Sequence, residues 1–305
     1  MMAAFVLLSA CTLTPGGGHA QETVMAEGGF IDLPQGRIHA IVRGRGPDLV
    51  MIHGANGNAR DFSHELIDRL ADDFRVIAFD RPGFGFSDSF GGLTSPIDQA
   101  DLLRVASAQL GVENPLVLGH SYGGAVSMAW ALRDGNNVAG LTLLAPATHP
   151  WPGELGFFYR FTDTALGQYV VLPAIALLTP RASFERVVAR VFRPNPVPDG
   201  YVDHLGVDLT LSTPQLQLNA QQINSLRAHL EAMAPGYPAL SLPIEVVHGS
   251  ADRIVGLHLH GERLLEDIES ARLTRLRGVG HMPHHARPEA VIEAIHRTAE
   301  RAGLR

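Results

Sequence analysis

The chain carries a serine between two glycines in the pentapeptide Gly-His-Ser-Tyr-Gly at positions 119–123. The apolar run 115–118 precedes it, and a stretch of small residues with helical character, 124–130, follows it. A strand, a sharp turn and a helix in this order form a nucleophile elbow, which exposes the serine hydroxyl at its tip. Glycines flank such a serine because side chains there would collide with the neighbouring strand and helix. The pattern therefore predicts that Ser121 is a nucleophile.

A serine hydroxyl is a weak nucleophile unless a base takes its proton and a third group orients that base. Sites on parallel sheets gather at the carboxyl ends of the strands, so both groups are expected directly after later strands. Asp252 follows the apolar run 244–247, and His281 follows a last predicted strand near 272–276. The preceding strand is followed by 145–148, which contains no carboxylate, and this favours Asp252 as the acid.

Two further histidines, His284 and His285, lie in the same loop as His281 and are alternative bases. Gly280 and the spacing from the strand end favour His281. Three histidines this close could also indicate a metal site. However, no carboxylate or cysteine joins them at ligand spacing, and no His-Glu-x-x-His motif occurs. We therefore expect neither a metal nor another cofactor.

The elements that must position these residues follow from the alternation of apolar runs with stretches of helical period. The alternation predicts a mostly parallel sheet with helices on both faces. A helix with the apolar stripe 62–70 is expected to begin at Asp61 as its N-cap. The strands are expected at 30–33, 37–42, 49–52, 76–79, 116–118, 141–144, 244–247 and 272–276, and further helices at 96–110, near 257–268 and from Pro288 onward.

The alternation stops near Pro146 and resumes near Leu242. Prolines break the intervening segment into short pieces, of which one around 184–191 and one from Thr213 to Met233 have a helical apolar face. Its apolar stretch 165–178 is too short to cross a membrane, and packing inside the insertion is favoured over a lipid-facing lid. The predicted division is a core at 23–146 and 239–305 with a helical cap at 147–238.

Residues 29–302 resemble an α/β-hydrolase of the single-cap type. The resemblance rests on His53-Gly54, the turn 80–87, the elbow, Asp252 and His281, which occur in the order of that family. It implies an α/β fold: a mostly parallel, doubly wound α/β-hydrolase sheet with a helical cap insertion.

The resemblance also implies a role for each matching position. Ser121 would attack a substrate carbonyl, and His281 would accept its proton and return it to the leaving group, while Asp252 holds His281 in the required tautomer. The oxyanion would be held by the backbone N–H groups of Ala55 and Tyr122. In supporting roles, His53, Gly54 and His120 would order the oxyanion loop and the elbow.

The leading functional hypothesis is hydrolysis of a carboxylic ester of a small or medium apolar substrate through an acyl-serine. Epoxide hydrolases and haloalkane dehalogenases resemble one another in using aspartate at the elbow, so Ser121 argues against both. Carbon–carbon bond hydrolases, lactonases and haloperoxidase-like members share the same triad and stay open, as does a non-catalytic ligand-binding relative. An apolar pocket is suggested by the aromatic residues of the cap, Trp151, Phe157, Phe158, Tyr159, Phe161, Tyr169 and Phe192.

Composition and the first residues bear on partners and location. At 305 residues with 46% hydrophobic content the chain can bury a large core, and its net charge of -7 gives no basic footprint for nucleic acid.

The apolar stretch 3–8 followed by Leu-Ser-Ala-Cys at 8–11 resembles a secretory signal with a bacterial lipobox, although no Lys or Arg precedes it. Residues 1–22 are thus expected to be a signal and linker. Lipidated Cys11 would anchor an exported, periplasmic protein to the membrane. Cleavage after Ala20 and a cytoplasmic protein are the alternatives.

Overall fold

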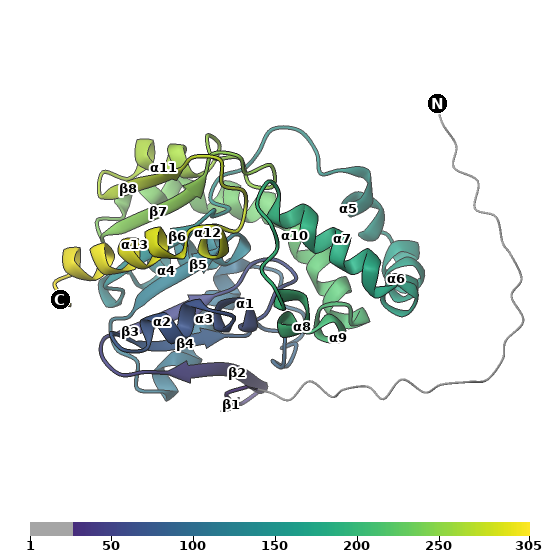
Figure 1. Cartoon of the computed structure of the whole chain (residues 1–305), viewed down its shortest axis with the longest axis horizontal. Coiled ribbons are helices and arrows are strands. Elements are labelled where there is room, and N and C mark those ends of the chain that lie inside the picture. The colour runs from purple at the N-terminus through teal and green to yellow at the C-terminus, as the bar shows by residue number, and fades with distance from the viewer. Residues whose placement is uncertain (1–26) are drawn as a thin grey trace, which may run out of the picture.

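The computed structural model describes residues 27–305. The predicted signal at 1–22, the lipidation at Cys11 and the expectation of export lie outside the described residues and stay predictions. Figure 1 shows a single twisted sheet flanked by helices, with a group of helices beyond one edge of it. The eight strands lie in the order β1-β2-β4-β3-β5-β6-β7-β8. They are β1 (Gly29–Leu33), β2 (Gly36–Arg43), β3 (Asp48–Ile52), β4 (Arg75–Phe79), β5 (Leu116–His120), β6 (Gly140–Leu144), β7 (Ile244–Gly249) and β8 (Ala271–Leu276).

Strand direction confirms the predicted fold class. The pairs of β2 with β1 and with β4 are antiparallel, and every other pair in the sheet is parallel. The central strands are buried on both faces, as continuous apolar runs require. Successive side chains of these strands point to opposite faces of the sheet and so belong to two different hydrophobic cores. In β3, for example, Val50 and Ile52 belong to one core, and Leu49 and Met51 belong to the other.

Helices cover both faces of the sheet, so the fold is doubly wound. One core includes residues of α3 (Pro96–Gln109), α4 (Tyr122–Asp134) and α11 (Gly261–Asp267). The other includes residues of α2 (Leu66–Leu70) and α13 (Pro288–Arg301). Shorter helices complete this part of the chain: α1 (Arg60–Ser63), η1 (Gly135–Asn137) and α12 (Pro283–Ala286).

The prediction of a single helix over 62–70 with Asp61 as its N-cap is wrong. The structure has two short helices, α1 and α2, which are separated by His64 and Glu65. Asp61 lies inside α1, its side chain is buried, and its carboxylate accepts hydrogen bonds from residues far away in the sequence. The apolar spacing could not show this, because a buried carboxylate needs partners that only the tertiary fold supplies.

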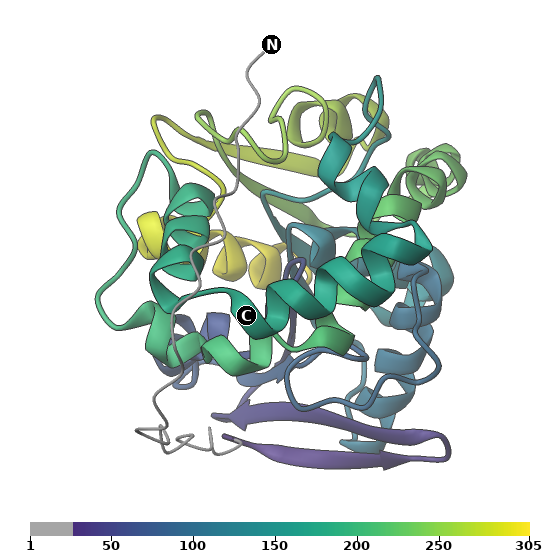
Figure 2. The ribbon, with the colours of Figure 1, turned by 90° about the vertical axis from the view of Figure 1, so that its right-hand side faces the viewer.

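Between β6 and β7 the chain forms only helices and loops in the structure. Figure 2 shows these helices in front of the sheet. The longest of them, α10, packs against α4, α5 and α6. A separate cap domain with the predicted boundaries stays a prediction. The helices are α5 (Phe157–Thr162), η2 (Gly167–Val171), α6 (Leu172–Leu178), α7 (Arg181–Phe192), α8 (Tyr201–Leu205), α9 (Val207–Thr210), α10 (Thr213–Met233) and η3 (Ala234–Ala239).

The apolar stretch 165–178 was expected to pack inside this insertion, and for most of its large side chains that expectation is wrong. Leu177 is 84% exposed and Leu178 is 71% exposed, whereas Leu172 is buried. Among the described residues, no helix has the length and the apolar content that crossing a membrane requires.

Candidate active site

The serine of the pentapeptide lies at the sharp turn between β5 and α4. Ser121 has φ 54° and ψ −115°, a conformation that residues other than glycine rarely adopt. The turn is held in place by a hydrogen bond from the Ser121 N–H to the Leu144 carbonyl at 2.9 Å. Backbone strain of this kind persists where surrounding structure enforces it, which is common at catalytic residues. The sheet and α4 thus present the Ser121 side chain at the carboxyl edge of the sheet.

The glycines of the elbow are required by close packing, which gives a testable prediction. A Cβ on Gly123 would lie 2.1 Å from the Ile52 carbonyl oxygen, so backbone would have to move. Gly123→Ala should therefore lower the free energy of unfolding by about 1–3 kcal/mol. Gly135→Ala is the matched control at the other end of the same helix, because a Cβ there meets nothing within 4 Å and φ is −57°. Urea unfolding of both variants measures the difference, and equal stabilities would contradict this view of the elbow.

The structure brings the three predicted catalytic side chains together. His281 Nε2 lies 2.9 Å from Ser121 Oγ, and His281 Nδ1 lies 2.8 Å from Asp252 Oδ2. Ser121 and His281 are 8% and 5% exposed, and the Asp252 side chain is fully buried. The chain of hydrogen bonds therefore runs from a nearly buried hydroxyl to a buried carboxylate through one imidazole. This is the geometry in which His281 can take the hydroxyl proton.

Asp252 is held as a carboxylate despite its burial. Burial alone would raise its pKa, but hydrogen bonds from His248 and His281 lower the pKa well below the ordinary value. The backbone N–H groups of Ile254 and Val255 donate to its other oxygen at 2.8 Å and 3.0 Å. An ionised Asp252 accepts the Nδ1–H of His281, which leaves the Nε2 lone pair directed at Ser121.

The loop after β3, which contains the predicted oxyanion donor Ala55, is fixed by the buried cation Arg81. Its guanidinium donates to the carbonyl oxygens of His53 at 3.1 Å and Gly54 at 3.0 Å. The Gly54 carbonyl and the Ala55 N–H belong to one planar trans peptide and point in opposite directions. Holding that carbonyl toward Arg81 therefore fixes the direction of the Ala55 N–H.

His53 completes this arrangement as a neutral imidazole. Its Nε2 accepts the backbone N–H of Arg81 at 2.9 Å, so the ring proton is on Nδ1, which contacts the Gly54 carbonyl at 2.8 Å. Burial, aided by the charge of Arg81, lowers the pKa of His53 to about 3. Gly54 packs directly against the elbow, because a Cβ there would lie 3.2 Å from Ser121 Cβ.

The second predicted donor, Tyr122, is the first residue of α4. The first four N–H groups of a helix have no acceptor within it, so the Tyr122 N–H is free to bind an anion, and the helix dipole favours negative charge there. The Tyr122 side chain has a different task. Its ring stacks under the Arg81 guanidinium, 4.4 Å from the ring centre, and its hydroxyl donates to the Thr94 carbonyl.

His120 and the two extra histidines form a buried cluster around Asp61. The Asp61 carboxylate contacts His284 Nε2 at 3.1 Å and His285 Nε2 at 2.9 Å, and accepts the Tyr201 hydroxyl at 2.8 Å. Burial alone would raise the pKa of Asp61, but its histidine partners, His284 first, hold it well below the ordinary value. His120 connects the cluster to the triad, because its Nε2 lies 2.9 Å from the His281 carbonyl oxygen.

The cluster corrects one step of the sequence argument about metals. We expected no carboxylate to join the histidines, yet Asp61 does, from 223 residues away. Asp61, His120 and His284 each offer one ligand atom within 4.8 Å of the others, close enough to share a divalent ion. In the structure Asp61 Oδ2 and His284 Nε2 already contact each other as a hydrogen-bonded pair at 3.1 Å. The expectation of no metal stays a prediction.

A cavity of about 460 Å³ opens above Ser121. Its walls come from the loop after β3, the elbow and the helical insertion, and most of its lining is apolar. Of the aromatic residues expected to form a pocket, Phe158, Tyr159 and Phe192 line this cavity, and Trp151, Phe157, Phe161 and Tyr169 do not.

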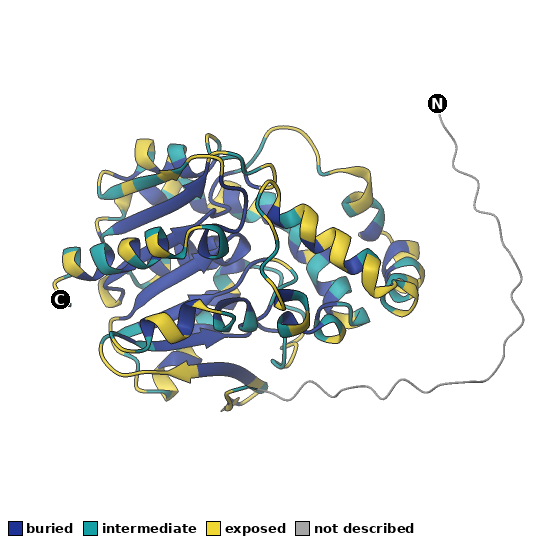
Figure 3. Cartoon of the chain, viewed as in Figure 1, coloured by how far each residue is buried: buried dark blue, intermediate teal, exposed yellow. Residues whose placement is uncertain are grey.

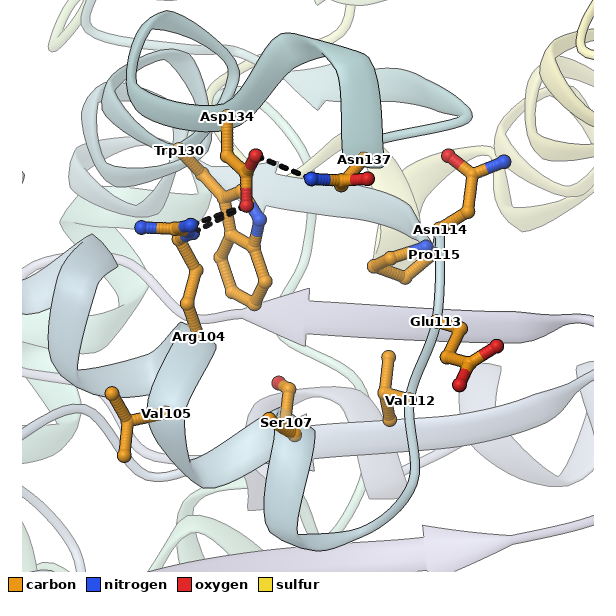
Figure 4. Close-up of a pocket in the computed structure, with 11 residues that line it drawn as sticks. Arg104, Val105, Ser107, Val112, Glu113, Asn114, Pro115, Trp130, Asp134 and Asn137 are labelled. Atoms are coloured by element: carbon orange, nitrogen blue, oxygen red, sulfur yellow. Dashed lines mark hydrogen bonds and ion pairs between the residues drawn. The ribbon is translucent and has the colours of Figure 1, made fainter.

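A second hollow, of about 550 Å³, lies at the opposite edge of the sheet. Its lining includes Pro115, which precedes β5, whereas Ser121 follows β5. Figure 4 shows that an ion pair between Arg104 and Asp134, extended by Asn137, crosses one wall of it. Ligand sites of open α/β sheets lie outside the carboxyl ends of the strands, so the cavity at Ser121 is the candidate active site.

Several residues of the site gave no recognisable signal in the sequence. Asn195, in the loop after α7, accepts the Gly280 N–H at 2.8 Å and so braces the loop of His281. His248, four residues before Asp252, lies 3.3 Å from its carboxylate. The sequence pattern marks Arg81 only as part of the turn 80–87. These roles depend on long-range contacts, which residue spacing alone does not encode.

Comparisons with known proteins agree with this fold. A haloalkane dehalogenase of Mycobacterium tuberculosis is 32% identical over 150 residues, and the match spans 48% of this chain and 51% of that enzyme. A pimeloyl-[acyl-carrier protein] methyl ester esterase of a Shewanella species is 27% identical over 218 residues, covering 65% of this chain and 79% of the enzyme. An esterase structure from Exiguobacterium antarcticum superimposes with a TM-score of 0.71 at 21% identity, covering 89% of this chain and 99% of the other.

The dehalogenase match is thus about half the length of that relative, and the structural match at 21% identity concerns the fold alone. The family assignment has a separate basis. The sequence model of the Alpha/beta hydrolase family matches residues 49–294, which is most of the chain and spans β3 to α13. Together with the sheet order and the elbow, this match shows that the chain belongs to the alpha/beta hydrolase family.

Proposed function

We propose that this protein is a serine hydrolase that cleaves a carboxylic ester of a small or medium apolar substrate through an acyl-serine intermediate. The observation that carries the proposal is the line of hydrogen bonds from Ser121 to His281 and on to Asp252, at 2.9 Å and 2.8 Å, on the wall of an apolar cavity. A structural serine would have no need of a buried carboxylate behind its histidine partner.

In the proposed reaction, Ser121 Oγ attacks the ester carbonyl carbon while its proton passes to His281 Nε2. Negative charge on the former carbonyl oxygen is stabilised by the N–H groups of Ala55 and Tyr122. The C–O bond to the alcohol then breaks, and the alcohol leaves with the proton from His281. Water attacks the acyl-serine in the same way, which releases the carboxylic acid and restores Ser121.

The lining of the cavity supports a mostly apolar substrate that carries at most a few polar groups. The helical insertion contributes Leu172, Ile175 and Val188 among its apolar walls. Within the described part of the chain, the amide oxygens of Asn56 and Asn219 are buried at this cavity without a hydrogen-bond partner. A buried acceptor without a partner is costly, so a substrate with one hydroxyl or N–H in reach of either oxygen would gain affinity.

Halide displacement, the reaction of the dehalogenase relative, is not proposed. Such enzymes resemble one another in having aspartate at the elbow, where this chain has Ser121. Lactones are cyclic esters and would react through the same acyl-serine, whereas a carbon–carbon hydrolase must expel a carbanion instead of an alcohol. The triad itself does not distinguish among these leaving groups.

A series of p-nitrophenyl esters tests the proposal. Because the cavity is apolar and of moderate volume, we expect kcat/KM to rise from the acetate to the butyrate and to fall again for acyl chains that exceed the cavity. Ser225→Ala, a change in α10 at a half-buried residue that does not line the cavity, is the control and should match the unsubstituted protein. Release of p-nitrophenol no faster than in buffer, for every ester of the series, would refute ester hydrolysis.

A further inference from the structure

The helical insertion carries an unusual share of the exposed apolar surface. Of the thirteen large hydrophobic side chains that are exposed among the described residues, eight lie between Phe157 and Val187. A large amount of exposed apolar surface in one part of a soluble protein commonly marks a binding site. We define the cap face by its most exposed members, Phe157, Leu166, Tyr169, Val170, Leu177 and Leu178.

The cap face is formed by consecutive elements of the chain. It runs through α5, η2 and α6, whose inner sides pack on α10 and on one another. Figure 3 shows exposed residues along α6 and α7, at the end of the molecule away from the sheet. Tyr169 and Leu177 are 77% and 84% exposed, so their apolar surface is almost as accessible as in an unfolded chain.

Charge provides the second, independent observation. The whole chain has a net charge of -7, yet residues 157–193 contain five arginines and only two acidic residues. Arg186 and Arg190 are four residues apart, which places them on one side of α7, and Arg193 follows as the residue that caps the end of the helix. Within residues 27–305 the structure records no ion pair for any of these three, and all three are exposed.

We propose that the cap face and the arginine side of α7 bind the surface of an anionic lipid bilayer. Exposed apolar side chains on α5, η2 and α6, followed in the chain by arginines on α7 without ion pairs among the described residues, match a surface that is apolar inside and negative at its headgroups. A second copy of the chain is the poorer occupant, because a symmetric contact through this face would bring two arginine-rich helices together.

The position of the cavity suggests how binding to a bilayer would serve the proposed reaction. Phe158 of α5 and Val187 of α7 are exposed and also line the cavity above Ser121. An apolar molecule dissolved in the bilayer could therefore reach the cavity without crossing water. This last step rests on the proposed function, whereas binding to the bilayer does not.

Vesicle sedimentation tests the proposal. The full chain carrying Cys11→Ser, so that no lipid can be attached, is mixed with large unilamellar vesicles of phosphatidylcholine, with or without 30% phosphatidylglycerol. Ser121→Ala is added so that binding is measured without turnover. We expect clear partitioning into the phosphatidylglycerol vesicles and at least ~10-fold weaker partitioning into the neutral ones.

Two pairs of variants separate the apolar and the charged contributions. Leu177→Ser with Leu178→Ser should weaken partitioning about 10-fold or more, whereas Val105→Ser with Leu265→Ser, exposed elsewhere, should not. Arg186→Gln with Arg190→Gln should weaken binding about 10-fold on anionic vesicles only, and Arg272→Gln with Arg277→Gln should have little effect. Tyr169→Ser tests the same face if the leucine pair fails to fold. With Ser121 restored, the leucine pair should still cleave a soluble short ester.

Three results would overturn the proposal. The chain could stay in the supernatant with both kinds of vesicle. Its partitioning could be unaffected by the leucine and arginine changes, which would assign binding to residues before 27. Sedimentation velocity could show a dimer that the leucine pair abolishes, which would assign the cap face to a second copy. In each case the proposed ester hydrolysis is judged separately, by turnover of soluble esters.

Discussion

Ser121→Ala should lower kcat/KM for p-nitrophenyl butyrate on the order of 10⁴- to 10⁶-fold while leaving the fold intact. The hydroxyl oxygen is the only atom removed, and it lies 2.9 Å from the imidazole that is proposed to take its proton. His281→Ala should cost a similar factor, because the nucleophile and base act as one unit. Initial rates on the three purified proteins, with circular dichroism to verify folding, measure the effect.

The orientation of the base can be tested in the same assay. Asp252→Asn keeps the size of the side chain but cannot hold the Nδ1–H of His281 as an anion does, so kcat should fall about 10⁴-fold. The double variant Ser121→Ala with His281→Ala should be no worse than either single one. Retained turnover in Ser121→Ala, or fully additive losses in the double variant, would contradict a shared mechanism for these residues.

The second large effect expected is a loss of stability in mild acid. His53 and His260 are buried, and burial lowers the pKa of each from 6.5 to about 3. Burial also lowers the pKa of His120 well below 6.5. Above pH 6.5 these rings are neutral in both the folded and the unfolded chain. As the pH falls below 6.5, these histidines become protonated in the unfolded chain, whereas in the folded chain His53 and His260 stay neutral until about pH 3. The free energy of unfolding therefore decreases over that pH range.

The size of this effect follows from linkage. At pH 5, each histidine with such a pKa costs about 2 kcal/mol relative to pH 8, so His53 and His260 together remove about 4 kcal/mol. The low pKa values have a structural basis. His260 Nδ1 accepts the N–H groups of Thr148 and His149, each at 3.1 Å, and a protonated ring would lose both bonds. Below about pH 4 the paired carboxylates Asp61 and Asp252 add to the loss.

Urea unfolding at several pH values between 8 and 5, followed by tryptophan fluorescence, measures this prediction. His260→Gln should reduce the dependence of stability on pH, because one buried proton-binding group is gone. His258→Gln is the matched control, since His258 is exposed two residues away and its loss should change that dependence much less than His260→Gln does. A free energy of unfolding that is constant between pH 7 and pH 5 would show that these rings are not kept neutral by the fold.

The sequence predicted the parts of the fold that depend on local pattern. Apolar runs placed the strands within a few residues, because a strand buried on both faces consists mostly of apolar residues. Prediction from the sequence failed where contacts between residues far apart in the chain determine the structure. The sequence predicts Asp61 as a helix cap, whereas its carboxylate is buried among His284, His285 and Tyr201. The exposed side of α6 was likewise missed, because a run of apolar residues does not show whether it is covered.

The candidate site shows the same division. Ser121, Asp252 and His281 follow from position, since each lies in the turn or loop after a strand and the sheet brings strand ends together. The residues that hold them could not be found in this way. Arg81 orients the Gly54–Ala55 peptide, and Asn195 braces Gly280, through contacts that arise only when the chain is folded. Their side chains have no distinctive spacing, so no pattern in the sequence marks them.

Covalent labelling tests the central claim most directly, because it reads the reactivity of one side chain. The chain is incubated with an alkyl fluorophosphonate, and the intact mass and the proteolytic peptides are measured by mass spectrometry. A serine activated by His281 should take one phosphonyl group, located on Ser121, and Asp252→Asn should slow the labelling strongly. An unmodified Ser121 after prolonged incubation, or a label placed on another residue, would contradict the account.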